Sequence, residues 1–209
     1  MLTQAGHQRI ASAATLGAAA GLRLCLRSVT AEARARLEAR FGSLDLTNLP
    51  GYQQFLQANA AALLPLEATL EAARVAEIVP DWELRTRRTA ILEDLARTGA
   101  PVETLPMPGP FDVGGVLGTV YVLESSRLDA RVHLNTVKRS TDPRVLHATA
   151  FLRHGAGHHF WPSFLAILER HATADHETSA VDGAMRALAM FERASVWTDG
   201  GALAPPSHA

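Results

Sequence analysis

The chain has 209 residues, of which 47% are hydrophobic and 20% charged, and its formal net charge is −1. This length and composition are typical of one globular domain with a full hydrophobic core, and the near-neutral charge argues against a nucleic-acid binder. The single cysteine, Cys25, excludes an internal disulfide and a cysteine-based zinc site. We therefore expect a protein of a reducing compartment, the cytoplasm.

The N-terminal region is poor in large apolar side chains, and we expect a flexible extension over residues 1–21. The stretch over residues 10–26 consists mostly of alanine and glycine, so it is too weakly apolar to span a membrane. Over residues 22–41, apolar side chains recur at steps of three and four. This spacing predicts a helix, which Gly42 would end.

Two more helices are predicted before residue 100. Residues 45–51 (DLTNLPG) form a turn with capping residues, and a helix follows over residues 52–70. Pro65 lies inside this helix and lacks a backbone N–H, so we expect a kink or break near Leu64. Asp81 can cap a third helix, which continues to Gly99.

The second half of the chain begins with a linker, because residues 101–110 contain four prolines. Residues 112–133 are rich in valine and glycine, but the spacing of their large apolar side chains favours a helix over a strand. A short helix is predicted over residues 142–152, and two longer ones over residues 160–171 and 176–197.

No convincing strand is found anywhere in the sequence. The predicted fold class is therefore all-α, a single-domain helical bundle of about seven helices over residues 22–198, followed by a disordered tail at residues 199–209. Such bundles build ligand sites between facing helices.

Few residue patterns point to chemistry directly. Gly114, Gly115 and Gly118 follow no strand, so they do not form a dinucleotide-binding loop. They allow either close helix packing or the approach of a flat ligand, and we favour packing. Cys25 lies on an apolar helix face, where a buried inert thiol is favoured over a nucleophile.

Three histidines are clustered in the segment RHGAGHHFW. His154 and His158 have the i, i+4 spacing of metal ligands on a helix, and His159 follows them. Two glycines interrupt this spacing, so we interpret the cluster as surface histidines and predict no metal site.

Four segments of the chain carry motifs that are informative in combination. They are LRSVTAEARARLE from Leu26, DLTNLPGYQQFLQ from Asp45 with LLPLEATL from Leu63, GTVYVLESSRLDARV from Gly118, and FLRHGAGHHFWPSFLAIL from Phe151. Together they resemble bacterial heme oxygenases, particularly those that accompany bacterial phytochromes. The resemblance implies an all-α fold in which a proximal and a distal helix clamp heme. It also implies cleavage of heme, with oxygen and electrons, to biliverdin, carbon monoxide and iron.

The resemblance fails at positions that carry the family's chemistry. Where the family has its axial histidine, this chain has Arg34, whose guanidinium offers no lone pair to iron. Where the family has distal glycines that lie against the porphyrin, this chain has Ser125, Asp129 and Ala130. The positions that the resemblance implies at the pocket are Arg34, Thr30, Tyr121, Ser125, Ser126 and Asp129.

Arg34 and Asp129 lie on the two helices that the resemblance places across the pocket. We predict that they form an ion pair through the space where heme would sit; the alternative is that each points to solvent. If they meet inside the pocket, both are partly buried, and removing one partner should cost about 3–5 kcal/mol of stability. If they lie at the surface, each single change should stay within about ±0.5 kcal/mol.

Three functions remain open at this point. One is an active heme oxygenase with non-standard ligation, for which His154, His158 and His159 are the candidate ligands. The others are a pseudoenzyme that acts through a signalling partner, such as a phytochrome or sensor kinase, and a protein that binds heme or another tetrapyrrole without oxygenation. We favour the last two, with no catalytic residue, no histidine-ligated heme of the usual kind, and no nucleic-acid or membrane partner.

Overall fold

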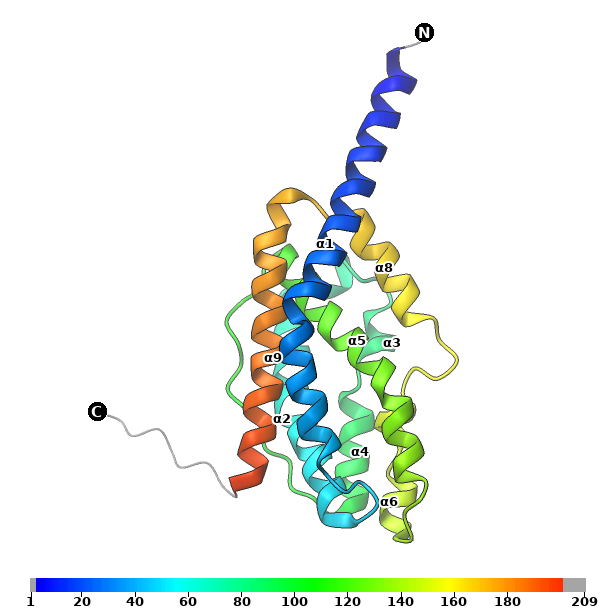
Figure 1. Cartoon of the computed structure of the whole chain (residues 1–209), viewed down its shortest axis with the longest axis vertical. Helices are drawn as coiled ribbons and strands as arrows, with labels where there is room; N and C mark the ends of the chain where they lie inside the picture. The colour runs from blue at the N-terminus through cyan, green and yellow to red at the C-terminus, as the bar shows by residue number, and fades with distance from the viewer. Residues whose placement is uncertain (1–2, 201–209) are drawn as a thin grey trace, which may run out of the picture.

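The computed structural model describes residues 3–200, with side chains over residues 21–197 (Figure 1). This part of the chain contains nine α-helices, two 3-10 helices and no strand, which confirms the all-α prediction. The elements are α1 (Thr3–Gly42), α2 (Leu49–Ala72), η1 (Val75–Glu77), α3 (Trp82–Arg85), α4 (Arg88–Thr98), α5 (Val113–Val137), α6 (Pro143–His147), α7 (Ala150–Arg153), α8 (Phe160–His171), η2 (Ala174–His176) and α9 (Glu177–Gly200). Within this span, seven α-helices have five residues or more.

Helix α1 begins much earlier than the apolar spacing indicates. It starts at Thr3 rather than at Leu22, and its N-terminal part projects past the rest of the bundle (Figure 1). Alanine favours the helix without needing a packed face, which explains a helix that apolar periodicity does not reveal. The flexibility expected of residues 1–21 stays a prediction. The expected tail lies mostly at residues 201–209, outside the described residues.

Helix α2 continues through Pro65, so the break considered near Leu64 does not occur. A proline leaves the carbonyl four residues earlier without its helical partner. Here that carbonyl belongs to Ala61, and it accepts a 3.0 Å hydrogen bond from the backbone N–H of Leu105 in the proline-rich linker. The linker thus satisfies the group that would otherwise favour a break.

The predicted helix from Asp81 to Gly99 is divided into α3 and α4. Asp81 occupies the N-cap position of α3 as predicted, but its side chain makes no capping hydrogen bond and pairs instead with the buried Arg85 at 2.7 Å. The carboxylate of Glu67 on α2 accepts hydrogen bonds from the backbone N–H groups of Arg87 and Arg88, at the start of α4. Gly99 ends α4 with a φ of 74°, a conformation that favours glycine.

The predicted helix over residues 142–152 is divided in the same way, into α6 and α7. The buried carboxylate of Asp94 accepts hydrogen bonds from the backbone N–H groups of Ala150 and Phe151 at 3.0 and 2.8 Å. A carboxylate from a neighbouring helix therefore caps each new helix start, which a local pattern does not show.

Helices α5 and α9 cross at very short range. A Cβ atom added to Gly118 would lie 1.8 Å from the carbonyl oxygen of Ala180, and one added to Gly183 would lie 2.4 Å from the carbonyl oxygen of Gly115. These glycines allow two helix backbones to touch, which confirms the packing interpretation.

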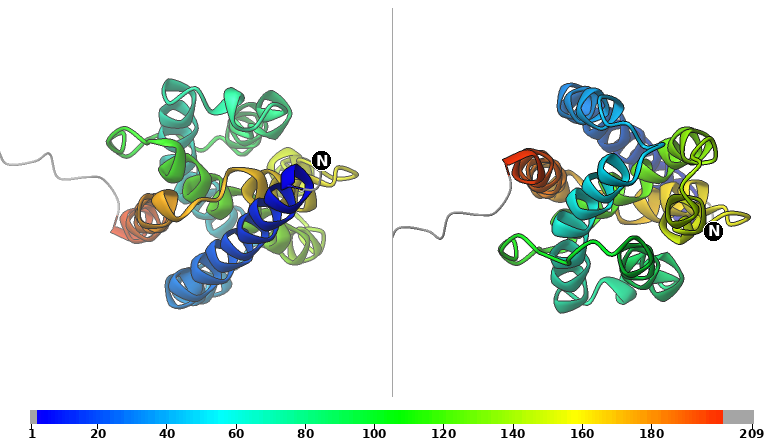
Figure 2. Two further views of the ribbon diagram at one scale, coloured as in Figure 1. Left: turned by 90° about the horizontal axis from the view of Figure 1, so that it is seen from above. Right: turned by 90° about the horizontal axis from the view of Figure 1, so that it is seen from below.

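The long helices enclose one hydrophobic core, in which α9 packs against α1, α2 and α5. The proline-rich segment lies on one flank of the bundle and α8 on the other (Figures 1 and 2). Among the described residues, no helix combines the length and the apolar character needed to cross a bilayer.

Candidate functional site

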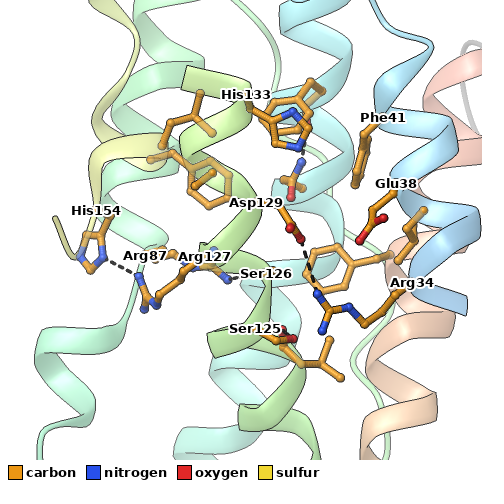
Figure 3. A pocket seen from close by; sticks show the side chains of 18 of the residues that line it. Arg34, Glu38, Phe41, Arg87, Ser125, Ser126, Arg127, Asp129, His133 and His154 are labelled. Atoms are coloured by element: carbon orange, nitrogen blue, oxygen red, sulfur yellow. Dashed lines mark hydrogen bonds and ion pairs between the residues drawn. The ribbon is translucent and has the colours of Figure 1, made fainter. Parts of the chain in front are cut away.

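A pocket lies between α1, α2 and α5 and has an empty volume of about 800 Å³, including the space at its mouth (Figure 3). Much of its wall is aromatic or aliphatic. These lining residues are Leu37, Phe41, Phe55, Val122, Ala130, Phe151, Leu152, Leu188 and Phe191. Predominantly apolar clefts with a few placed polar groups are typical of small-molecule sites.

Arg34 and Asp129 meet inside this pocket. An Nη2 atom of Arg34 on α1 lies 3.7 Å from an Oδ2 atom of Asp129 on α5, which confirms the predicted ion pair (Figure 3). The distance exceeds that of a good hydrogen bond, so the contact is one of charge. The side chains are 27% and 42% exposed, so the pair is only partly buried.

The six positions implied by the resemblance separate into two groups. Arg34, Ser125, Ser126 and Asp129 line the pocket. Thr30 and Tyr121 are buried and are not among the residues that line it, so a role for them in binding stays a prediction. The Thr30 hydroxyl donates to the carbonyl of Leu26 at 2.6 Å, and the Tyr121 ring packs on Trp161 with centroids 5.4 Å apart.

The hydroxyl groups of the two serines donate hydrogen bonds to backbone carbonyls within α5. Ser125 donates to the carbonyl of Val122 at 3.0 Å, and Ser126 donates to that of Leu123 at 2.8 Å. They therefore add volume to the α5 wall of the pocket, where the resemblance implies a glycine at the position of Ser125. Each hydroxyl can offer a ligand only its acceptor lone pairs.

His133 also lines the pocket, and the sequence prediction missed it. It lies one helical turn beyond Asp129 on α5, and its ring centroid is 5.0 Å from that of Phe55. Burial lowers the pKa of His133, against the opposing charges of Asp129 and Glu38, so the imidazole is neutral at pH 7. The i, i+4 spacing from Asp129 is a signal that could have identified it.

His154 lines the pocket from the loop before α8 and is half-buried. Its Nδ1 atom lies 3.0 Å from Nη1 of Arg127, and burial together with Arg127 and Arg87 lowers its pKa to about 4. The surface interpretation is therefore wrong for His154, whereas His158 and His159 are exposed as expected.

A charged network supports this side of the pocket. Glu124 is buried and contacts both Arg85, at 3.2 Å, and Arg127, at 3.1 Å. Arg87 is also buried, and its Nη2 atom donates to the Ser126 hydroxyl at 3.1 Å. No local pattern marks these residues, because partners from α3, α4 and α5 meet only in the folded chain.

Other groups with potential chemistry lie apart from the pocket. Cys25 is half-buried, and burial and Glu177 raise the pKa of its thiol, which disfavours the nucleophilic thiolate. Over the part of the chain that is described, no group of three or more His, Cys, Asp or Glu side chains is arranged to hold a metal ion.

This all-α bundle, with a pocket between its first helix and α5, is similar to known proteins. No family model matches the chain. A heme oxygenase from Neisseria meningitidis, whose structures bear NO and CO, has the same fold, with a TM-score of 0.69 and 19% identity over 88% of this chain and 96% of that one. A heme oxygenase from Xanthomonas campestris pv. campestris is 30% identical over 145 residues, which are 67% of this chain and 86% of the relative. The chain belongs to the heme oxygenase family.

Proposed function

We propose that this member of the heme oxygenase family binds a tetrapyrrole without cleaving it. The observation that carries the proposal is the contact between Arg34 and Asp129 inside the pocket. By the resemblance, these two positions are where the family has its axial ligand and a distal glycine. Both now carry charged side chains that attract each other.

The residues present do not fit heme held by an imidazole from α1. The guanidinium of Arg34 offers no lone pair to iron, and its positive charge repels ferric iron. No histidine is found between His7 and His133, so a shift by one turn along α1 does not supply a ligand. Ser125 and Asp129 further occupy the wall against which the porphyrin face would lie.

The pocket does suit the body of a tetrapyrrole. Its aromatic and aliphatic lining matches a large flat apolar ligand, and its cationic side chains match carboxylates at the ligand edge. The Arg34–Asp129 contact is partly exposed and longer than a hydrogen bond, so a ligand can displace it at a modest cost. The pocket can therefore bind a tetrapyrrole even though α1 supplies no ligand to iron.

A pair of titrations tests this proposal. Because α1 provides no bond to iron, ferric heme and a metal-free porphyrin should saturate the protein with similar dissociation constants. The Arg34→His variant should tighten heme binding by less than about tenfold, that is by less than about 1.4 kcal/mol, because Ser125 and Asp129 still occupy the distal wall.

Two results would contradict the proposal. One is a wild-type absorbance spectrum typical of histidine-ligated heme that stays the same when His133 and His154 are replaced, since the ligand would then come from another histidine. The other is the absence of saturable binding by either compound. The second result would favour a regulatory role through a protein partner, such as a phytochrome or sensor kinase.

A second candidate function is an active heme oxygenase with non-standard ligation, and His133 is the observation that favours it. This neutral imidazole lines the pocket from α5, the helix opposite Arg34. If His133 binds iron, the His133→Ala variant should lose the histidine signature in the absorbance and electron paramagnetic resonance spectra. Formation of biliverdin by the wild type, but not by this variant, would establish the second candidate over the first.

A further inference from the structure

Arg87 is a buried cation without an acidic partner. The residue is only 4% exposed, yet it lines the pocket. Its Nη2 atom donates to the carbonyl of Leu123 at 3.3 Å and to the Ser126 hydroxyl at 3.1 Å, and its guanidinium lies over the ring of Phe151 at 5.1 Å. Within the described part of the chain, no carboxylate oxygen lies within 4.0 Å of its guanidinium nitrogens, because the nearby carboxylates pair with other arginines.

The acidic side chains nearby are already paired. Glu124 contacts Arg85 and Arg127, and Glu67 contacts Arg88 at 3.4 Å. The backbone N–H of Arg87, not its side chain, donates to Glu67 at 2.7 Å. Asp81 and Glu71 add two further negative charges to this network through Arg85 and Arg88, so its charges balance, yet the guanidinium of Arg87 itself contacts no carboxylate.

Such a charge is costly in a protein without its ligand. Desolvation of a charged group disfavours folding, and burial together with the neighbouring Arg127 lowers the pKa of Arg87 to about 9, against the opposing charges of Glu67 and Glu124. The group is nevertheless protonated at pH 7. The charged guanidinium therefore lies in the wall of the pocket without a carboxylate in direct contact with it.

The guanidinium of Arg87 still has N–H groups that can donate to a ligand. The hydrogen bonds of its side chain to described residues all leave from Nη2, whereas Nε and Nη1 also carry N–H groups. The neighbouring Arg127 already contacts Glu124, and its Nη1 atom lies beside Nδ1 of His154 (Figure 3), so it is not free to serve in place of Arg87.

We infer that Arg87 receives a carboxylate of the ligand inside the pocket. A guanidinium binds a carboxylate through two parallel N–H donors, and the aromatic rings around it suit an anion carried on a flat apolar body. This inference rests on the proposed tetrapyrrole binding and specifies it further, since it requires a ligand with a free acid rather than a neutral porphyrin. Arg34, at the α1 side of the same pocket, is paired with Asp129 and does not meet this requirement.

A charge-removal experiment on the ligand tests the inference in the wild-type protein. The probes are a metal-free porphyrin with two propionates and its dimethyl ester, titrated in the same buffer. The free acid should bind about tenfold or more tightly than the ester. In Arg87→Met this preference should disappear, and in the matched control Arg131→Met, which replaces an exposed arginine on α5, it should be retained.

A structural readout accompanies the titration. Arg87→Met breaks no ion pair and removes only the side-chain hydrogen bonds to Leu123 and Ser126, so the urea midpoint of the ligand-free variant should lie close to that of the wild type. A lower midpoint, with an acid preference that survives the substitution, would mean that Arg87 only supports the fold and would overturn the inference. Equal binding of acid and ester by the wild type would also overturn it, while leaving the proposed function intact.

A smaller probe separates the inference from the proposed function. A naphthoate ion should raise the melting temperature of the wild type but not that of Arg87→Met, and the neutral naphthamide should raise neither. If no porphyrin binds but naphthoate behaves in this way, the proposed function fails and the carboxylate site stands. If neither the porphyrin acid nor naphthoate distinguishes wild type from variant, the carboxylate site is refuted.

Discussion

The two sides of the pocket carry the same kinds of charged group, an arginine and a carboxylate, but differ in how far solvent reaches them. On the α1 side, Arg34 and Asp129 are partly exposed and 3.7 Å apart. On the other side, Glu124 is 1% exposed and lies 3.2 Å from Arg85, which is fully buried. Solvent weakens the first contact, whereas burial makes the second depend on every partner. A ligand can therefore displace the first contact, whereas the second is a rigid network that supports the opposite wall of the pocket.

The largest effect should come from the buried wall. Glu124→Gln removes the carboxylate that Arg85 and Arg127 share, and leaves buried guanidinium charge uncompensated. The free energy of unfolding should fall by about 3–5 kcal/mol, measured by urea denaturation. In the matched control Glu93→Gln, which affects an exposed pair with Arg97, the change should stay within about ±0.5 kcal/mol.

A loss of less than about 1 kcal/mol for Glu124→Gln would contradict this contrast. It would mean that water reaches the network and that both sides of the pocket are equally adaptable.

The next effect concerns pH and the same wall. Because the folded pKa of His154 is about 4 and its ordinary value is 6.5, the unfolded chain takes up the proton first on acidification. The stability that neutral His154 provides is complete above pH 6.5 and is lost as the pH falls toward 4. The loss should be about 1–2 kcal/mol, since the ring is only half-buried.

The measurement is urea denaturation between pH 7 and 4 of the wild type and of His154→Asn, whose side-chain oxygen can still accept from Arg127. Subtracting the two curves isolates His154 from the other titrating groups. A difference curve that is flat across this range would show that His154 is solvated in the folded protein.

The smallest effect should come from the α1 side. Arg34→Met and Asp129→Asn should each cost at most about 1 kcal/mol, with a coupling energy of about 0.5 kcal/mol that decreases at high salt. This corrects the 3–5 kcal/mol expected of a buried pair, because the observed exposure allows solvent to screen the charges. A double-mutant cycle in urea measures the coupling, and a value above about 2 kcal/mol would mean that the pair is locked.

Much of the fold could be predicted from the sequence, since α5 and α8 lie where the apolar spacing places them. The errors have tertiary causes. Leu105 satisfies the carbonyl that Pro65 leaves free in α2, and carboxylates of Glu67 and Asp94 cap helices that begin in the middle of predicted ones. These groups are distant in sequence, so a local pattern does not contain them.

The candidate site was only half predictable, for a similar reason. Arg34 and Asp129 were found because a family motif marks both positions. Arg87 and His154 belong to no motif, and their importance arises from burial and from the charges around them. His133 was also missed, although its i, i+4 spacing from Asp129 is visible in the sequence.

The most direct test of binding without cleavage is a single-turnover reaction. One equivalent of ferric heme is loaded, a reductant is added in air, and absorbance is followed beside an active bacterial heme oxygenase as positive control. With Arg34 in place of the α1 ligand, the heme should be recovered intact and biliverdin should not exceed the amount formed by free heme. Formation of one equivalent of biliverdin, with loss of the heme band, would contradict the account and establish an active enzyme.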